Sequence, residues 1–180
     1  MTISSLADAL HSDRPAADRA ERMALYGFLV GSWSYDAIYH PPGKPVRTTK
    51  GEIHAGWVLD GRALQDVWIV PARGIARASP PEFGDYCGTT LRVYDPGLDV
   101  WHILWIDPLT QTYRRQLGRA RGRDIVQEGR DEASFAHVRW SFTDITPDSF
   151  RWLGEASPDG GPDTGRTWTL LADFRAKRIS

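Results

Sequence analysis

From Gly31 onward, large apolar residues recur at every second position in short runs. In the run WSYDAIYH, residues Trp33, Tyr35, Ala37 and Tyr39 share one parity and mostly polar residues hold the other. Successive side chains of a strand point to opposite faces, so this alternation predicts a strand that is buried on one face and wet on the other. Eight tryptophans among 180 residues favour sheet further, because aromatic side chains suit a pleated, half-buried surface.

The same pattern predicts about ten strands, separated by turn sequences such as HPPGKP, LDGR, YDPGLD and ITPDS. We place the strands near residues 33–40, 46–59, 62–70, 86–94, 100–106, 112–118, 125–129, 137–143, 149–156 and 167–176. Short reversals make consecutive strands antiparallel. Residues 71–84, PARGIARASPPEFG, are too long and too rich in proline for a hairpin, so they predict a mobile loop that can serve as a lid.

A single helix is expected over residues 16–30, where Ala20, Ala24, Leu25 and Phe28 follow a helical spacing. The first 15 residues are expected to be flexible or to form a short helix. One helix cannot cover the apolar face of a ten-stranded sheet, so the sheet must close on itself or fold into a sandwich. We predict an all-β fold: one domain over residues 1–180, with a closed antiparallel barrel of about eight to ten strands over residues 31–176 and the helix plugging one end.

Alternation also predicts which side chains face the barrel interior, and most of them are aromatic. The expected inward set is Trp33, Tyr35, Ala37, Tyr39, Ile53, Ala55, Trp57, Trp101, Ile103, Trp105, Val138, Trp140, Phe142, Phe150, Trp152, Trp168, Leu170, Ala172 and Phe174.

Composition excludes several classes of function. Lysines and arginines number 22 against 23 acids, so the chain offers no basic footprint for nucleic acid and no cationic face for a membrane. Cys87 is the single cysteine, which excludes an internal disulfide, and the first thirty residues carry charges without a long apolar run. We therefore expect a cytoplasmic location.

The helical stretch ALYGFLV followed by Gly31 and Trp33 resembles the opening of the calycin superfamily, which includes lipocalins, fatty-acid-binding proteins and nitrobindins. A basic residue of the last strand, here Arg175, would stack over Trp33 and seal one end of the barrel. The runs FLVGSWSYD, GWVLDGRALQDVW, GTTLRVYDP and DITPDSFRW look like an uncharacterised family of bacterial lipocalin-like proteins. The resemblance implies a closed barrel and carries over no settled activity.

Haem binding of the nitrobindin kind needs a proximal histidine late in the chain. The strands expected from Ser149 onward contain none, so we expect no haem and no other cofactor.

Glu52 and His54 alternate on one strand and therefore share a face, a spacing that suits an acid and a base or two metal ligands. Alternation turns that face outward, so solvated residues are the favoured interpretation. A third ligand such as His102 would have to come from a distant strand, and no Cys/His cluster has a ligand spacing, so we expect no metal.

Asp66 is the ionisable residue whose environment matters most. If it faces inward with Trp68, it is a desolvated carboxylate fit for acid–base work; if not, it pairs with Arg62 or Arg92 on the outer wall. The sequence does not choose between these two alternatives.

Asp107 and Tyr113 flank a short reversal and are candidates for a polar cluster at the rim of the barrel. For Asp107 we favour a turn-capping role before Pro108, and Tyr113 is the better pocket candidate. The strand arginines Arg92, Arg114, Arg115, Arg139 and Arg151 either hold a carboxylate inside or keep their heads in water.

Two functions remain, besides a filled barrel that acts through its surface. The first is binding of a small hydrophobic or aromatic ligand, with walls from Tyr35, Trp57, Trp68, Trp105, Trp140 and Trp152. The alternative is a cofactor-independent lyase, isomerase or cyclase that uses Asp66, His54 or Tyr113 on a hydrophobic or phenolic substrate. Whether the protein is an enzyme, and whether it forms a homodimer, is left open by the sequence.

Overall fold

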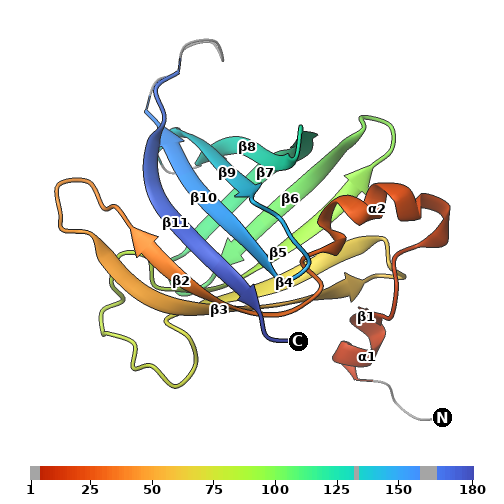
Figure 1. Cartoon of the computed structure of the whole chain (residues 1–180), viewed down its shortest axis with the longest axis horizontal. Helices are drawn as coiled ribbons and strands as arrows, with labels where there is room; N and C mark the ends of the chain where they lie inside the picture. The colour runs from red at the N-terminus through yellow and green to blue at the C-terminus, as the bar shows by residue number, and fades with distance from the viewer. Residues whose placement is uncertain (1–4, 132–133, 159–165) are drawn as a thin grey trace.

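A computed structural model describes residues 5–131, 134–158 and 166–180 of the chain, and its strands wrap into a closed barrel (Figure 1). The barrel strands are β2 (Gly31–Tyr39), β3 (Arg47–Val58), β4 (Ala63–Val70), β5 (Tyr86–Asp95), β6 (Val100–Asp107), β7 (Thr112–Arg121), β8 (Asp124–Asp131), β9 (His137–Thr143), β10 (Ser149–Ser157) and β11 (Thr169–Arg178).

Every neighbouring pair in the barrel is antiparallel. From β4 to β11 each strand pairs with the next one in sequence, β11 returns to β2, and β2 pairs with β3. The additional pairing of β3 with β4, in which Ile53 lies opposite Trp68, closes the ring. The structure thus confirms the closed antiparallel barrel, and each of the ten predicted strands is present with ends shifted by a few residues.

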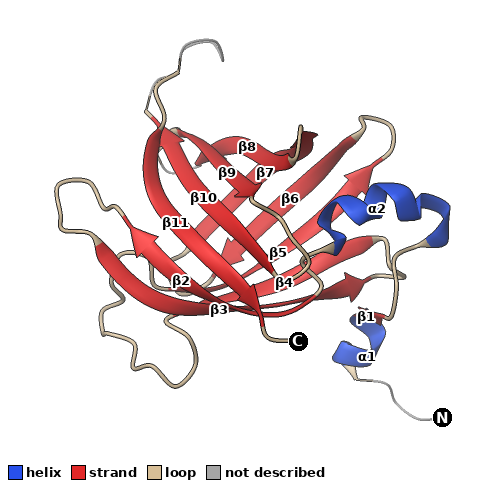
Figure 2. Cartoon of the chain, in the orientation of Figure 1, coloured by secondary structure: helices blue, strands red, loops and turns tan. Residues whose placement is uncertain are grey.

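A helical segment closes one end of the barrel (Figure 2). It consists of a 3₁₀ turn, Ala17–Arg19, and the helix α2, Ala20–Gly27. Met23 and Tyr26 of α2 are fully buried, because one face of the helix points into the barrel. The helix ends at Gly27, earlier than predicted, because the chain turns there: the Val30 amide donates to the Gly27 carbonyl (3.3 Å).

Ahead of this segment lie a short helix α1, Leu6–Leu10, and a two-residue strand β1, His11–Ser12, which pairs with the end of β3. No helix of the described residues has the length and apolar character needed to cross a membrane.

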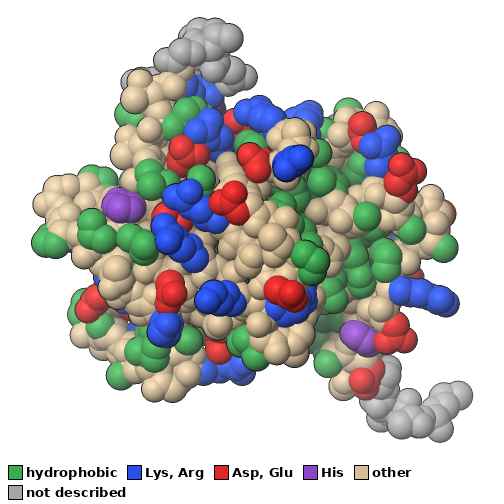
Figure 3. Space-filling model, viewed as in Figure 1, with side chains coloured by type: hydrophobic (Ala, Val, Ile, Leu, Met, Phe, Trp, Pro, Cys, Tyr) green, Lys and Arg blue, Asp and Glu red, His purple; other side chains and the backbone are tan. Residues whose placement is uncertain are grey.

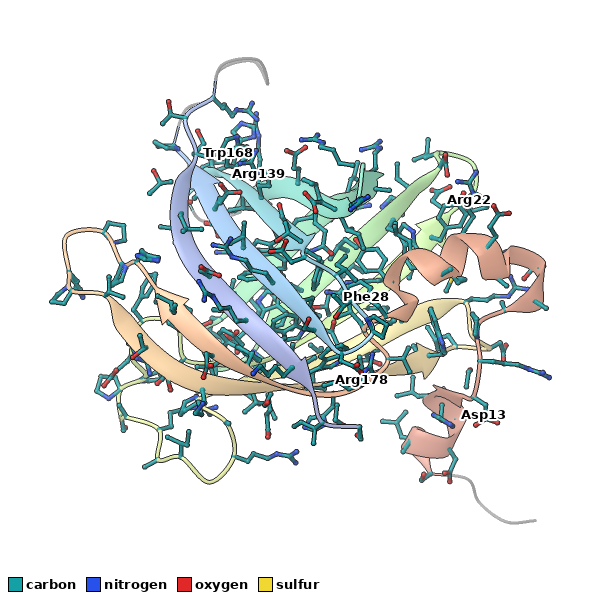
Figure 4. All side chains as sticks on the ribbon, viewed as in Figure 1. Asp13, Arg22, Phe28, Arg139, Trp168 and Arg178 are labelled. Atoms are coloured by element: carbon teal, nitrogen blue, oxygen red, sulfur yellow. The ribbon has the colours of Figure 1, made fainter. Side chains whose placement is uncertain are left out.

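Most side chains of the predicted inward set do face the interior, but the prediction fails at the start of β11. Gly154 lies opposite Ala172 and Glu155 lies opposite Leu170, so a bulge at Leu171 shifts the register. The prediction that Trp168 and Leu170 face inward is therefore wrong. Trp168 instead stacks on Arg139 (4.2 Å from guanidinium carbon to ring centroid), whose guanidinium also pairs with Glu155 (Figure 4).

At the closed end, a cation covers Trp33 as the calycin resemblance implies, but it is a different arginine. Arg175 lies opposite Asp36 on the outer face and is exposed. Arg178 stacks over Trp33 at 4.1 Å and donates to the carbonyls of Phe28 and Val30, both at 2.7 Å (Figure 4). The side chain therefore joins the end of β11 to the segment between α2 and β2.

We expect Arg178→Ala to lower the free energy of unfolding by about 2 kcal/mol, since it removes a cation stacked on an indole and leaves carbonyl groups without donors. Denaturant titration followed by tryptophan fluorescence measures the change. Arg175→Ala is the matched control and should cost less than about 0.5 kcal/mol. Equal effects of the two substitutions would show that the stacked arginine does not seal the barrel.

Candidate functional site

The barrel is hollow at the end away from α2, where a cavity of about 530 Å³ opens. The strand β2 begins next to α2 and ends at Tyr39, which lines the cavity. Much of the wall is aromatic: the lining includes Tyr39, Trp68, Phe83, Tyr86, Trp105, Trp140, Trp152 and Phe174. A volume of this size lies within the range of small-molecule sites in proteins.

The indoles form a continuous chain of rings around the cavity. Ring centroids lie 6.1 Å apart for Trp105 and Trp140, 5.6 Å for Trp140 and Trp152, and 5.8 Å for Trp152 and Trp68. Trp152 also stacks on Phe174 at 4.7 Å. Each ring is therefore held by its neighbours in an edge-on, tilted or stacked contact, which keeps the wall ordered.

Glycines let two of these rings lie against the barrel wall. A Cβ atom at Gly154 would lie 2.8 Å from the Trp152 ring, and one at Gly88 would lie 2.5 Å from the Trp105 ring. These rings occupy space over the two glycines that a side chain would otherwise take, which leaves more of the centre of the barrel open.

The floor of the cavity carries a buried ion pair. Asp66 and Arg92 are each 1% exposed, and Nη1 of Arg92 donates to Oδ2 of Asp66. The backbone amide of Thr90 donates to the other oxygen of Asp66 (3.1 Å). The sequence offered an interior carboxylate or an ion pair on the outer wall as alternatives. Asp66 is interior and pairs with Arg92, one of the two predicted partners, so the outer-wall position is wrong.

A second layer of polar groups lies under Arg92. Its Nε donates to Oε1 of Gln127 (3.3 Å), which also accepts from the Tyr26 hydroxyl of α2 (3.2 Å). The guanidinium lies over the rings of Tyr26 (5.3 Å) and Phe142 (5.7 Å). The helix at the closed end is thus linked to the cavity floor through a hydrogen-bonded network.

Two further charged residues face the cavity from β6 and β7. Asp107 is 1% exposed and accepts hydrogen bonds from the amides of Cys87 (3.3 Å) and Leu109 (2.9 Å) and from the Thr110 hydroxyl. The prediction that Asp107 caps the turn is therefore confirmed. Arg114 pairs with Asp131 (3.1 Å) and lies over Trp140 (5.6 Å).

The segment between β4 and β5, in which we predicted a lid, supplies part of the mouth of the cavity. Residues 81–85 line the cavity, and Arg47 of β3 binds three of them. Arg47 donates to the Phe83 carbonyl (2.6 Å) and pairs with Glu82 (2.9 Å) and Asp85 (2.6 Å). Opening or closing of this segment stays a prediction.

Three tyrosines place neutral hydroxyl groups in or beside the wall. The Tyr35 and Tyr86 hydroxyls share a hydrogen bond of 2.8 Å, and Tyr39 lies near them. Burial raises the pKa of all three phenols well above the ordinary value. They therefore remain uncharged across the physiological range.

Of the six residues predicted to form the walls, the structure places four on the cavity: Trp68, Trp105, Trp140 and Trp152. Tyr35 is buried behind the wall, where it stacks on Phe174 (4.9 Å). Trp57 is also buried, beside Gly27 of α2 at the closed end.

The three residues proposed for acid–base chemistry are not brought together. Asp66 faces inward, but Tyr113 is 49% exposed and lies on the outer face opposite Ile106. Its neighbours Thr112 and Arg114 line the cavity instead. Successive side chains of β7 alternate between the two faces of the sheet, and Tyr113 belongs to the outward set. The expectation that Tyr113 faces the pocket is therefore wrong.

His54 lies outside the barrel, as alternation predicts, where Nδ1 contacts the Ser32 hydroxyl (3.1 Å) and Nε2 contacts Arg73 (2.9 Å). Arg73 also donates to Glu52. Across residues 5–131, 134–158 and 166–180, no three His, Cys, Asp or Glu side chains gather in an arrangement that holds a metal ion.

The sequence-based reading missed the contribution of Phe83 and Tyr86. Both lie at or next to the segment after β4, whose path over the mouth follows from its anchoring by Arg47. Alternation carries no signal for Phe83, since residues 81–85 belong to no strand. Tyr86 begins β5 and shares the parity of the buried Thr90 and Arg92, so alternation in that strand could have found it.

The buried pair gives a stability test. We expect Arg92→Met to cost about 3 to 5 kcal/mol, because it leaves the Asp66 carboxylate in the interior without its cation. The double variant Asp66→Asn/Arg92→Met should recover most of that loss, as measured by denaturant titration at neutral pH. A double variant no more stable than Arg92→Met alone would contradict this account of the floor.

No protein-family model and no curated protein matches this chain. Solved structures do resemble it in shape. One is Rv2717c from M. tuberculosis, with a TM-score of 0.59, 15% identity, and coverage of 89% of this chain and 99% of that one. Another is the S-type phycobiliprotein lyase CPES from Guillardia theta, with a TM-score of 0.59, 12% identity, and coverage of 92% and 99%. The chain therefore has a calycin-like fold.

Proposed function

We propose that this protein binds a small hydrophobic or aromatic molecule in the cavity of the barrel. The observation that carries the proposal is an open volume of about 530 Å³ bounded by four indoles. A barrel filled by its own side chains would leave no such space.

The wall suits a planar ligand in particular. Aromatic pairs add about 0.5 to 1.5 kcal/mol each beyond simple burial, so several indoles around one flat molecule hold it firmly. The rings of Trp105, Trp140 and Trp152 are already fixed by contacts with one another, so little side-chain order has to be gained on binding.

Catalysis on such a ligand is the alternative. It draws on the fold likeness to a protein described as a phycobiliprotein lyase and on the inward Asp66. We favour binding, because the Asp66 carboxylate is engaged by Arg92 and by the Thr90 amide, and its proposed partners His54 and Tyr113 lie outside the cavity. A base needs a free oxygen within reach of the substrate proton.

Titration with pyrene, followed by quenching of tryptophan fluorescence, tests the proposal. We expect saturable quenching by the wild-type protein. Gly154→Ala should weaken pyrene binding about tenfold, because the added methyl group pushes the Trp152 ring into the cavity.

Gly56→Ala is the matched control, since a Cβ at Gly56 of β3 meets nothing within 4 Å. It should bind pyrene as the wild type does. If the wild-type protein shows no saturable quenching, or if both alanine variants bind unchanged, the cavity is not the binding site.

A further inference from the structure

The formal charges of the ionisable side chains around the cavity do not cancel. On its lining and in direct ion pairs with that lining lie the acids Asp66, Glu82, Asp85, Asp107, Asp131 and Glu155, and the arginines Arg47, Arg92, Arg114 and Arg139. Six acids against four arginines leave two negative charges in excess. The outer surface, by contrast, mixes both signs over the face seen in Figure 3.

Among these acids, Asp107 is the one without an ion pair among the described residues. The ion pairs of the described residues engage the other five acids, with Glu82 and Asp85 sharing Arg47, but none of them includes Asp107. Its hydrogen bonds come from two amides and a hydroxyl, which are neutral donors.

The rest of the chain cannot supply the missing cation from a side chain. The segments outside the described residues read MTIS, EA and DGGPDTG, and they contain no Lys, Arg or His. A buried carboxylate without a counter-charge is costly, so a cation that enters the cavity from solution gains a strong interaction there.

Aromatic faces surround the same position. Trp105 precedes Asp107 by two residues on β6, so both side chains face inward, and Tyr86 stands edge-on to Trp105 at 5.6 Å. Cations bind over such rings by attraction to the negative π-face. Guanidinium groups of the protein already do so on two lining rings, with Arg114 over Trp140 (5.6 Å) and Arg47 over Tyr39 (5.9 Å).

We propose that the ligand is an organic cation: a protonated or quaternary amine attached to an apolar, preferably aromatic, body. The cationic group lies against Asp107 and Trp105, and the apolar body lies among Trp68, Trp140 and Trp152. The inference rests on the proposed binding function and names its ligand class.

An anionic ligand is disfavoured by the same geometry. Arg92 and Arg114 are the arginines on the cavity lining, and each is engaged by an acid of the protein, Asp66 and Asp131 respectively. A ligand carboxylate would have to compete with these acids and would lie near Asp107 as well.

Three probes with one aromatic body and different head groups test the inference: trimethyl(pyrenylmethyl)ammonium, pyrenemethanol and pyrenecarboxylate. Each is titrated into the wild-type protein at neutral pH and followed by tryptophan quenching. We expect the ammonium probe to bind about tenfold more tightly than the neutral alcohol, and the carboxylate to bind most weakly.

Asp107→Asn isolates the charge. The amide oxygen can still accept from the Cys87 and Leu109 amides, so the turn is retained while the negative charge is lost. The ammonium probe should then bind within about threefold of the alcohol. Asp60→Asn is the control for net charge: Asp60 is exposed, follows β3 near the closed end, and has a positive φ (57°) that asparagine also adopts.

The outcomes separate the two proposals. Failure of all three probes to bind overturns the binding function itself. Binding of the alcohol or the carboxylate as tightly as the ammonium probe overturns the cationic ligand but leaves the binding function standing. Equal loss of the ammonium preference in Asp107→Asn and Asp60→Asn would assign the effect to net charge and also overturn it. If Asp107→Asn does not fold, the wild-type ranking decides.

Discussion

The pairing of β3 with β4 is the constraint on which the rest of the structure depends. Without it the sheet would have two free edges and a long apolar face in water; with it, each inward position of the ten strands faces the inward positions across the barrel. The interior of a closed barrel is either filled by side chains or left open as a cavity. Near α2 the interior is filled, by Tyr26, Trp33 and Phe142. Towards the other end it is not.

The chain's sequence makes the strands and the barrel predictable, because alternation is a local property and closure follows from the size of the apolar face. It predicts less well wherever an extra residue changes parity. The bulge at Leu171 turns Trp168 outward. In β7 no residue is inserted, and the register against β6, with Tyr113 opposite Ile106, puts Arg114 inside and Tyr113 outside. Both outcomes depend on how a strand pairs with its neighbour, and the pattern within one strand does not record that.

The sequence predicted the type of some long-range contacts but not which residue makes them. A cation over Trp33 was expected, yet the choice between Arg175 and Arg178 depends on where β11 ends relative to β2, since only Arg178 also reaches the Phe28 and Val30 carbonyls. For Asp66, the sequence supplied both an interior position and an arginine partner as separate alternatives. The register of β4 against β5 makes them one arrangement, with Leu64 opposite Arg92 and Asp66 opposite Thr90.

The two ends of the interior treat charge differently. At the floor, Arg92 and Asp66 compensate each other, and Gln127 and Tyr26 satisfy further hydrogen bonds, so the cost of burying charge is offset within the protein. Towards the mouth, Asp107 accepts from neutral donors and has no charged partner among the described residues, and the turn it caps needs only its oxygens, not its charge. An uncharged side chain with the same acceptor would satisfy that turn, so the charge is what distinguishes this position. The turn does not require the negative charge of Asp107, and the proposed cationic ligand in the cavity beside it accounts for that charge.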